Sequence, residues 1–378
     1  RSRGELEPFL KMLPMLNRRQ FIQLSGVTLM SAVGSQSCSA KTESYEQAVQ
    51  RIWQHTTLLS TDALAVQREL VRYATLAASS HNTQCWKFKL EEHQILILPD
   101  LERRCPAVDP DDHHLYASLG CAIENLLQAA PAFGLQGSVD LRSTEAINIQ
   151  LEATQPVRSP LFEAIPDRQS TRAEYDGKPL SNADLKLLEK AAIGDGVNLI
   201  LLTEKQAMEK VLEYVVAGNT AQINDPAFVK ELKAWIRFND REAVRQGDGL
   251  FAKSSGNPTA PHWIASTLFD QFFTPKAENE KYTRQLRSSA GIAIFVSDAN
   301  TKSHWVAAGR AYQRFALQAA ALDIRTAFLN QPVEVPDLRP QFANHLGIGD
   351  RRPDLVVRFG RGAKMPNSLR RSLESVII

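Results

Sequence analysis

The alternation of hydrophobic and polar positions along the 378-residue chain predicts helices and strands of ordinary length. Apolar residues that recur every three to four positions share one helix face, and they predict helices at residues 43–57, 61–77, 117–133, 182–192, 205–217 and 304–322. Short apolar runs bounded by polar residues predict strands at residues 86–90, 95–98, 139–142, 147–152, 197–202, 292–296 and 355–359. This mixture of elements is typical of an α+β protein.

Local signals sharpen some of these boundaries. Ser181 is a good N-cap for the helix at 182–192, and Asp184 in its first turn suits the positive end of the helix dipole. Pro131 perturbs the helix at 117–133, and Gly134 ends it. The polar residues 91–93 predict a hairpin between the first two strands.

The chain contains a weak internal repeat. Residues 120–135 align without gaps on residues 309–324, with glycine, alanine and apolar residues at matching positions. Chance similarity between alanine-rich helices is the alternative. A duplicated α+β unit would place these two helices across a pseudo-twofold axis, where small residues allow close approach. We therefore expect a first half at residues 41–160 and a second half at 161–378.

A segment between Asn219 and Ser289 fits neither half. It carries Trp235 and Trp263 together with several prolines, glycines and polar patches. We expect an insertion with some helix at about residues 221–288, called the lid below.

The N-terminal segment, residues 1–40, has the layout of an export signal. Arg18 and Arg19 precede a mildly apolar stretch at 24–33, which small polar residues follow. The paired arginines resemble the twin-arginine motif, which a translocase receptor reads; an amphipathic helix is the alternative. We expect export to the periplasm, or otherwise through the twin-arginine pathway, with transient contact with the translocase.

Cys38 raises the alternative of a lipid anchor. Ser35 stands where a lipobox requires Leu or Val, so we expect no lipid there.

Composition narrows the function classes. The 44 basic and 42 acidic residues give a net charge of +2, which argues against a nucleic-acid partner because such proteins carry a clustered basic excess. The chain is 43% hydrophobic and 23% charged, which suits a large buried core. Four cysteines are too few for a disulfide scaffold. An enzyme or a ligand-binding protein of about two units remains.

The loop that follows the second predicted helix is the most informative stretch. It holds hydroxyl and amide side chains in one short arc, at Ser79, Ser80, Asn82 and Gln84. Such groups suit the edge of a planar heterocycle with alternating donors and acceptors. A polar turn with an Asx motif is the structural alternative.

A second candidate segment contains Arg168, Gln169, Ser170 and Arg172. If the segment is helical, the two arginines four positions apart share a face. Guanidinium groups, hydroxyls and helix N-terminal amides together would bind a phosphate. The alternative is a solvated, salt-bridged helix start.

Near the C-terminus, Arg370 and Arg371 could add cations at the same phosphate. A basic C-terminal surface is the alternative.

Taken jointly, these pieces resemble the nitroreductase family of FMN-dependent oxidoreductases over roughly residues 60–378. That family has a Ser-x-x-Asn-x-Gln-Pro-Trp-x-Phe segment at the flavin ring, which matches residues 80–88 here except that Cys85 replaces proline. An Arg-x-Ser-x-Arg segment holds the FMN phosphate in the family and matches residues 168–172. Basic residues near the family's C-terminus return to the phosphate, as Arg370 and Arg371 could.

The resemblance implies a nitroreductase-like fold with FMN as cofactor. It implies electron transfer from NADH, NADPH or another donor to nitroaromatic, quinone or similar small acceptors. It also implies that Asn330 and Gln331 line the flavin edge, and that no side chain acts as a catalytic acid or base.

The order of the motifs departs from the family pattern. The phosphate segment follows the ring segment here, and each half of the chain keeps only one of the two. In the dimeric family one FMN is bound by these two segments from different subunits. The loss of one segment from each half therefore fits a fused pseudo-dimer, in which one chain forms a single composite site without a second chain. This resembles the twin-arginine-exported, Acg-like branch, in which an extra segment covers the flavin. Residues 235–237 and 248–250 of the lid are the expected contacts.

Two other functions stay open. The lid could block the flavin from substrate, which would make the chain a flavin-binding or flavin-sequestering protein. The chain could also be an exported α+β protein that has lost its cofactor.

The remaining sequence motifs support no further function. Asp109, His113 and His114 offer metal-ligating atoms, but adjacent histidines in a loop chelate one ion poorly, so we expect a solvated turn and no metal. The cysteines lack the spacing of a zinc site, although a Cys85–Cys105 disulfide is an alternative in an exported protein. Motifs of P-loop proteins, serine hydrolases and zinc proteases are absent from the sequence.

Overall fold

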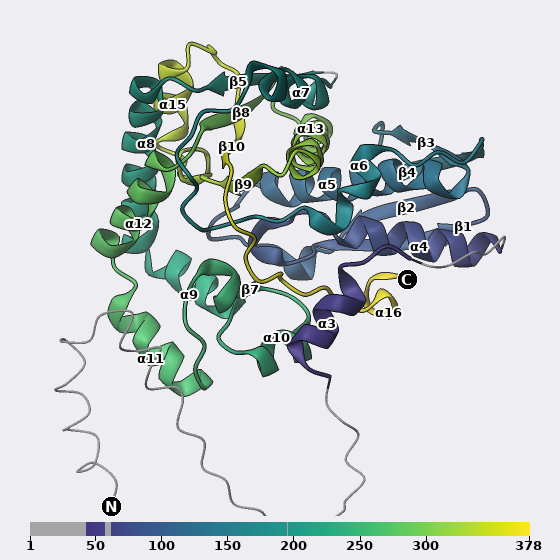
Figure 1. Ribbon diagram of the computed structural model, residues 1–378, viewed down its shortest axis with the longest axis horizontal. Coiled ribbons are helices and arrows are strands. Elements are labelled where there is room, and N and C mark those ends of the chain that lie inside the picture. The colour runs from purple at the N-terminus through teal and green to yellow at the C-terminus, as the bar shows by residue number, and fades with distance from the viewer. Residues whose placement is uncertain (1–42, 57–61, 195) are drawn as a thin grey trace, which may run out of the picture. The chain divides into compact units, whose positions relative to one another are not determined.

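Two antiparallel sheets of four strands organise the chain (Figure 1). The first has the order β1-β2-β4-β3, and its strands are β1 (Trp86–Glu91), β2 (Gln94–Pro99), β3 (Leu135–Asp140) and β4 (Ile147–Ala153). The second has the order β5-β8-β10-β9, with β5 (Val197–Leu202), β8 (Gly291–Ser297), β9 (Arg325–Phe328) and β10 (Pro353–Gly360). The computed structural model describes residues 43–56, 62–194 and 196–378, so the predicted export signal at residues 1–40 lies outside the described residues. The α+β fold class is confirmed.

Helices α5 (His113–Ala129) and α13 (Lys302–Ala321) pack against each other over much of their length (Figure 1). Helix α5 also packs on β2 and β3 of the first sheet, whereas α13 packs on the strands of the second sheet. The pair therefore joins the two sheets.

Glycine allows this close approach. A Cβ atom at Gly120 would lie 2.0 Å from the carbonyl oxygen of Val306, and one at Gly309 would lie 1.9 Å from that of Ala117. Both glycines come from the internal repeat, at matching positions. Next to them, Cys121 donates a hydrogen bond from Sγ to the carbonyl of Gly309 at 3.3 Å.

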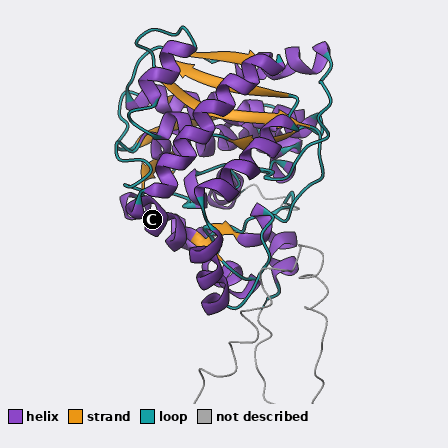
Figure 2. Ribbon diagram, turned by 90° about the vertical axis from the view of Figure 1, so that its left-hand side faces the viewer, coloured by secondary structure: helices purple, strands orange, loops and turns teal. Residues whose placement is uncertain are grey.

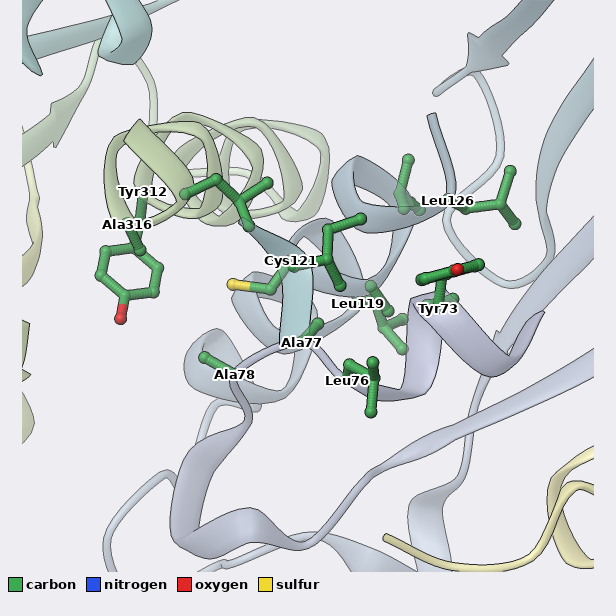
Figure 3. Packing of buried hydrophobic residues seen from close by; sticks show 14 of the residues in the cluster. Tyr73, Leu76, Ala77, Ala78, Leu119, Cys121, Leu126, Tyr312 and Ala316 are labelled. Atoms are coloured by element: carbon green, nitrogen blue, oxygen red, sulfur yellow. The ribbon is translucent and has the colours of Figure 1, made fainter. Parts of the chain in front are cut away.

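The hydrophobic core fills the space around the same helices. Figure 3 shows Tyr73 and Leu76 from the α4 region, Leu119 and Leu126 from α5, and Tyr312 from α13 in one cluster. Every residue of β8 and β10 is buried, because helices cover both faces of the second sheet at these strands. A strand that is covered on both faces has a continuous run of apolar residues. This run makes β8 easy to predict from the sequence.

The remaining helices flank this core. Outside the lid they are α3 (Tyr45–Ile52), α4 (Ala63–Thr75), α6 (Pro160–Glu163), α7 (Asn182–Ala192), α8 (Lys205–Asn224), α14 (Gln331–Glu334), α15 (Arg339–His345) and α16 (Leu373–Val376). Short 3₁₀ turns lie at Ser80–Asn82, Leu101–Arg103, Ala130–Phe133 and Ile165–Asp167. Among the described residues, every helix is too short or too polar to cross a bilayer.

The lid contains four helices and two short strands. They are α9 (Pro226–Trp235), β6 (Ile236–Arg237), α10 (Asp240–Gln246), β7 (Leu250–Phe251), α11 (His262–Phe272) and α12 (Pro275–Arg287), with a 3₁₀ turn at Ala252–Ser255. Strands β6 and β7 pair in parallel, and Figure 2 shows them apart from the two larger sheets.

Several predicted boundaries are confirmed and some are wrong. Ser181 caps α7 by accepting a hydrogen bond from the backbone of Asp184 at 3.1 Å, as expected. The helix predicted at 117–133 instead begins at His113, because the carboxylate of Asp109 accepts hydrogen bonds from the first free backbone amides of the helix. Strand β3 begins at Leu135 rather than at residue 139. Strand β9 was not predicted from the sequence, because its four residues carry no clear alternation.

We expect Gly120→Ala and Gly309→Ala each to lower the free energy of unfolding by about 1–3 kcal/mol, because the added methyl group overlaps a backbone carbonyl that cannot move alone. This loss would outweigh the gain of about 1 kcal/mol that alanine brings to a helix. Urea denaturation followed by circular dichroism measures it.

Gly194→Ala is the comparison variant and should lose less stability, because the nearest atom to its Cβ is the flexible end of the Arg314 side chain at 2.8 Å and not a backbone carbonyl. Unchanged stability in both helix variants would contradict the close approach.

Candidate functional site

The loop after α4 has an unusual backbone. His81, Asn82 and Gln84 adopt positive φ angles of 46°, 52° and 53°, a region that costs a non-glycine residue of the order of 1 kcal/mol or more. Hydrogen bonds hold the loop in this form: the backbone of Gln84 donates to Ser79 Oγ at 3.1 Å, and the backbone of Ser80 donates to Ser118 Oγ of α5 at 3.1 Å. The position of α5 therefore fixes the start of the loop.

The side chains of Asn82 and Gln84 are buried, and both bind the lid. Asn82 Nδ2 donates to the carbonyl of Gly249 at 2.9 Å, and Gln84 Nε2 donates to that of Gly247 at 2.8 Å. Asn82 also donates to the carbonyl of Leu369 and Gln84 accepts from the backbone of Arg371, so the C-terminal tail (residues 361–378) joins the same contact. The amides that the sequence predicts at a flavin ring thus also connect loop, lid and tail.

Arg370 lies buried at the C-terminal end of α4. Its guanidinium donates to the carbonyls of Thr75, Leu76 and Ala77, which have no partner within the helix, and to Asn82 Oδ1 at 3.0 Å. A cation suits this negative end of the helix dipole. Burial lowers the pKa of Arg370 well below its usual range, and the neighbouring charge of Arg168 adds to this.

Arg371 has a different environment. Its guanidinium donates to the carbonyls of Gln84 and Ser375 and lies 3.5 Å from a carboxylate oxygen of Asp100. Arg371 is therefore paired within the protein.

Arg168 has fewer hydrogen-bond partners than Arg370 or Arg371. It is only 4% exposed, and Nη2 donates to the carbonyl of Leu76 at 3.2 Å. Its Nε and Nη1 atoms are buried and have no hydrogen-bond partner among the described residues. Burying an unpaired charge is costly, and here Arg370 adds a second positive charge nearby. An anion beside Arg168 would satisfy both free donors and relieve the repulsion.

The segment around Arg168 is extended, so the helical arrangement that would place Arg168 and Arg172 on one helix face is not formed. The 3₁₀ turn ends at Asp167, and Ser170 then forms a parallel bridge with Thr326 at the edge of β9. Side chains alternate along an extended chain, so positions 168, 170 and 172 are expected on one side. Gln169 points elsewhere and binds the tail, where its Oε1 accepts from the backbone of Met365 at 2.8 Å.

Tyr312 of α13 lies beside this segment. Burial raises its pKa, whereas Arg168, Thr326 and Ser170 act in the opposite sense. The hydroxyl of Tyr312 is buried near the side chains of Ser170 and Thr326, but it meets the distance and angle of a hydrogen bond with neither of them nor with any other described residue.

Arg172 connects the segment to the loop after α4 and to the lid. Burial and then the charge of Arg172 lower the pKa of His81 to about 4, which keeps this imidazole neutral at pH 7. Arg172 also acts on Tyr282 of α12, whose pKa burial raises to about 12. Gln331 lies next to Tyr282. Asn330 is used differently, because its Oδ1 accepts from the backbone of Val356 at 2.9 Å.

Buried polar atoms without partners gather in this region. Among the described residues they include Arg168 Nε and Nη1, His81 Nδ1, Tyr312 Oη and Gln331 Oε1. Native proteins leave few such atoms unpaired, and each requires an explanation. The set offers a guanidinium fork for an anion together with neutral donors and an acceptor, so its chemistry fits a phosphate attached to a polar ring system. The structure brings the elements of all predicted segments close together, and Tyr312, Tyr282 and His81 are additions that the sequence did not single out.

A buried ion-pair network holds the lid against this region. The carboxylate of Asp248 pairs with Arg237 at 2.7 Å and with Arg103, whose Nε donates to the carbonyl of Thr83. The ring of Trp235 lies 5.2 Å from the Arg103 guanidinium and 5.7 Å from that of Arg237. Arg103 lies outside every motif, so no sequence pattern points to it.

A cavity of about 1300 Å³ opens on the lid itself and does not include Arg168 or the loop after α4. Lid residues alone line it, including Lys233, Arg241 and Glu242. It belongs to a mixed-charge surface of the lid.

Asp109, His113 and His114 are buried at the start of α5, so the predicted solvated turn is wrong. The helix extends over the two histidines and carries them into the interior.

Cys85, Cys105 and Cys121 are all free thiols, so the alternative of a Cys85–Cys105 disulfide is also wrong. Burial raises the pKa of Cys85 to about 11, which makes it a poor nucleophile.

Comparisons with known proteins were made by sequence and by structure. No family model matches the chain. Two proteins of Mycobacterium tuberculosis, from different strains and each named "Putative NAD(P)H nitroreductase", are 23% identical to this chain over an alignment of 323 positions that covers 82% of this chain and 90% of theirs.

Solved structures resemble about half of the chain. A nitroreductase from Desulfitobacterium hafniense with bound FMN covers 57% of this chain and 95% of its own, at 13% identity and a TM-score of 0.37. The FMN-dependent nitroreductase NfnB from Mycobacterium smegmatis, in complex with NADPH, covers 57% and 96%, at 11% identity and a TM-score of 0.38.

Proposed function

We propose that the chain is an FMN-dependent oxidoreductase of the nitroreductase type. It would pass electrons from a reduced nicotinamide or another donor to nitroaromatic, quinone or similar small acceptors. The buried guanidinium of Arg168, with two donors unpaired beside a second arginine, is the observation that carries the proposal. The motifs at residues 80–88 and 168–172 and the names of the mycobacterial relatives support it.

In this proposal Arg168 binds the FMN phosphate through Nε and Nη1, and Ser170 and Arg172 lie on the same side of the segment. Arg370 adds positive charge from the end of α4, where its own hydrogen bonds hold it in place. His81, neutral at pH 7, offers a hydrogen bond to the ring without adding charge. Gln331 Oε1 offers an acceptor from the side of α14.

When bound, FMN supplies the hydride and electron chemistry. The residues of this chain bind and orient the flavin and exclude water, and none of them is assigned as an acid or base. Asn82 and Gln84 hold the lid against the site through Gly249 and Gly247.

We also propose that the chain is a pseudo-dimer of two related halves, residues 41–160 and 161–378, that share this one site. The contact between Gly120 and Gly309 at matching repeat positions supports this arrangement. The loop at 79–84 belongs to the first half and residues 168–172 to the second, so one chain would suffice as a monomer. The paired Arg18 and Arg19 support export through the twin-arginine pathway to the periplasm.

A second function, sequestration of flavin, has its own support. The Asp248 network and the Asn82 and Gln84 contacts fix the lid with buried interactions on both sides. A lid held this firmly would keep a nicotinamide away from the ring.

Arg168→Gln tests the phosphate contact. We expect the purified chain to bind one FMN, and the variant to bind FMN at least tenfold more weakly, because a charged hydrogen-bonded contact contributes about 1.5–3 kcal/mol. Riboflavin has the same ring and lacks the phosphate, so its affinity should change little. Quenching of flavin fluorescence measures both dissociation constants.

Arg284→Gln is the control, since Arg284 is half-exposed and pairs with Glu174 on the surface. Equal loss of FMN and riboflavin binding in Arg168→Gln would contradict the assignment of the phosphate to Arg168.

Asp248→Asn separates turnover from sequestration. We expect NADH or NADPH to bleach the visible flavin absorption of the loaded chain under anaerobic conditions. We expect the variant to bleach faster, because Arg103 and Arg237 lose their shared carboxylate. Stopped-flow absorbance measures the rates. Asp270→Asn is the matched control, as it removes an exposed ion pair with Lys233 within the same lid.

Flavin that stays oxidised in the wild type and bleaches only in Asp248→Asn would favour sequestration. A chain that refuses added FMN would contradict both flavin functions.

A further inference from the structure

Three side chains with metal-ligating atoms meet at the start of α5, and none of them is assigned to FMN. Asp109, His113 and His114 are 4%, 0% and 5% exposed, and one ligating atom from each lies within 4.8 Å of the other two. The two imidazole rings are 4.7 Å apart between centroids and meet edge to face at 76°. At a helix start, neighbouring histidines can therefore turn toward one point.

His113 has the orientation of a metal ligand with a supporting carboxylate. Its Nε2 lies 2.8 Å from Asp354 Oδ1, and Asp354 Oδ2 accepts from the backbone of Ser297 at 2.6 Å. A carboxylate at Nε2 favours the proton on that nitrogen, which leaves the lone pair on Nδ1. His113 Nδ1 is buried and has no hydrogen-bond partner among the described residues.

His114 presents a second free nitrogen. Its Nε2 is buried without a hydrogen-bond partner, and Glu334 Oε1 lies 3.7 Å away. Two ligands of a tetrahedral zinc ion, each at about 2.0–2.1 Å, are about 3.3 Å apart, so this separation suits two ligands of one ion better than a direct hydrogen bond. The other oxygen of Glu334 accepts from Gln222 Nε2 at 2.7 Å, which fixes the carboxylate.

The local charge favours a cation. Five carboxylates face this cluster, those of Asp109, Asp111, Asp112, Glu334 and Asp354. Three guanidiniums accompany them, those of Arg339, Arg352 and Arg104, the last of which pairs with Asp112. This leaves an excess of two negative charges if all are ionised. Arg352 is already paired with Asp111.

We propose that His113 Nδ1, His114 Nε2, Asp109 and Glu334 bind one divalent transition-metal ion of the zinc class. Two imidazoles and two carboxylates match the nitrogen and oxygen ligands that zinc accepts. Asp109, His113 and His114 already lie together, and Glu334 would turn from its place 3.7 Å from His114 Nε2 to become the fourth ligand. With all four in place, protein atoms alone would fill the coordination sphere, so the proposed role of the ion is structural. It connects the start of α5 to α14, the short helix that carries Gln331 at the proposed flavin edge.

Metal binding to the purified chain tests the proposal, with any affinity-tag histidines removed. After treatment with a chelator, we expect one Zn²⁺ per chain by calorimetry and a rise in Tm when Zn²⁺ returns, because a ligand of the folded state stabilises it. Co²⁺ should give the visible absorption bands of a four-coordinate nitrogen and oxygen site.

Two variants locate the ion. His114→Asn should lower the affinity for Zn²⁺ by at least about 100-fold, and Asp354→Asn, which removes only the supporting carboxylate, by about 10–100-fold. His93→Asn is the control, because His93 is exposed in the β1–β2 turn, and its affinity should equal that of the wild type.

Zn²⁺ binding by His114→Asn at wild-type affinity would overturn the assignment. If circular dichroism shows that this variant does not fold, the test rests on the wild type. A chelator-treated wild-type chain that binds no stoichiometric Zn²⁺, or whose Tm does not rise when Zn²⁺ is added, would overturn the proposal.

Discussion

The contact between α5 and α13 at Gly120 and Gly309 is the constraint on which the rest of the structure depends. The helices are so close that a single added methyl group at either glycine would overlap a carbonyl of the other helix. Around this contact, polar side chains fix the register: Gln313 Nε2 donates to Asn125 Oδ1 at 2.7 Å, and Glu124 pairs with Arg314 at 2.8 Å. Few other arrangements of the two helices satisfy the same groups.

This contact also sets the geometry of the candidate site. Helix α5 carries Ser118, which holds the loop after α4, and α13 carries Tyr312, which lies beside Arg168 and Ser170. A small shift of one helix against the other would separate the loop from the arginine segment. The glycine contact thus determines the distance between two segments that are far apart in the sequence, and the proposed FMN site uses both.

Sequence patterns predict the elements well wherever burial is regular. The apolar run of β8 and the Ser181 cap of α7 are local signals, and both are confirmed. Local signals fail where tertiary contacts decide. Residues 168–172 contain helix-compatible residues, but pairing of Ser170 with Thr326 makes them extended. The start of α5 appears polar, yet packing against Trp305 and pairing with Asp354 bury its histidines.

Some residues of the candidate site can be predicted from the sequence because their side-chain type and local motif identify them, and others cannot because their role depends on distant contacts. Arg168 and Asn82 stand out by residue type, whereas the roles of Arg370 as a helix cap and of Arg103 in holding the lid depend on partners up to 295 and 145 positions away.

The location of the FMN phosphate tests the central claim most directly. A crystal structure of the chain with bound FMN should place the phosphate within hydrogen-bond distance of Arg168 Nε and Nη1, with the ring extending toward the loop after α4. A phosphate bound elsewhere, such as in the mixed-charge cavity of the lid, would contradict the composite site.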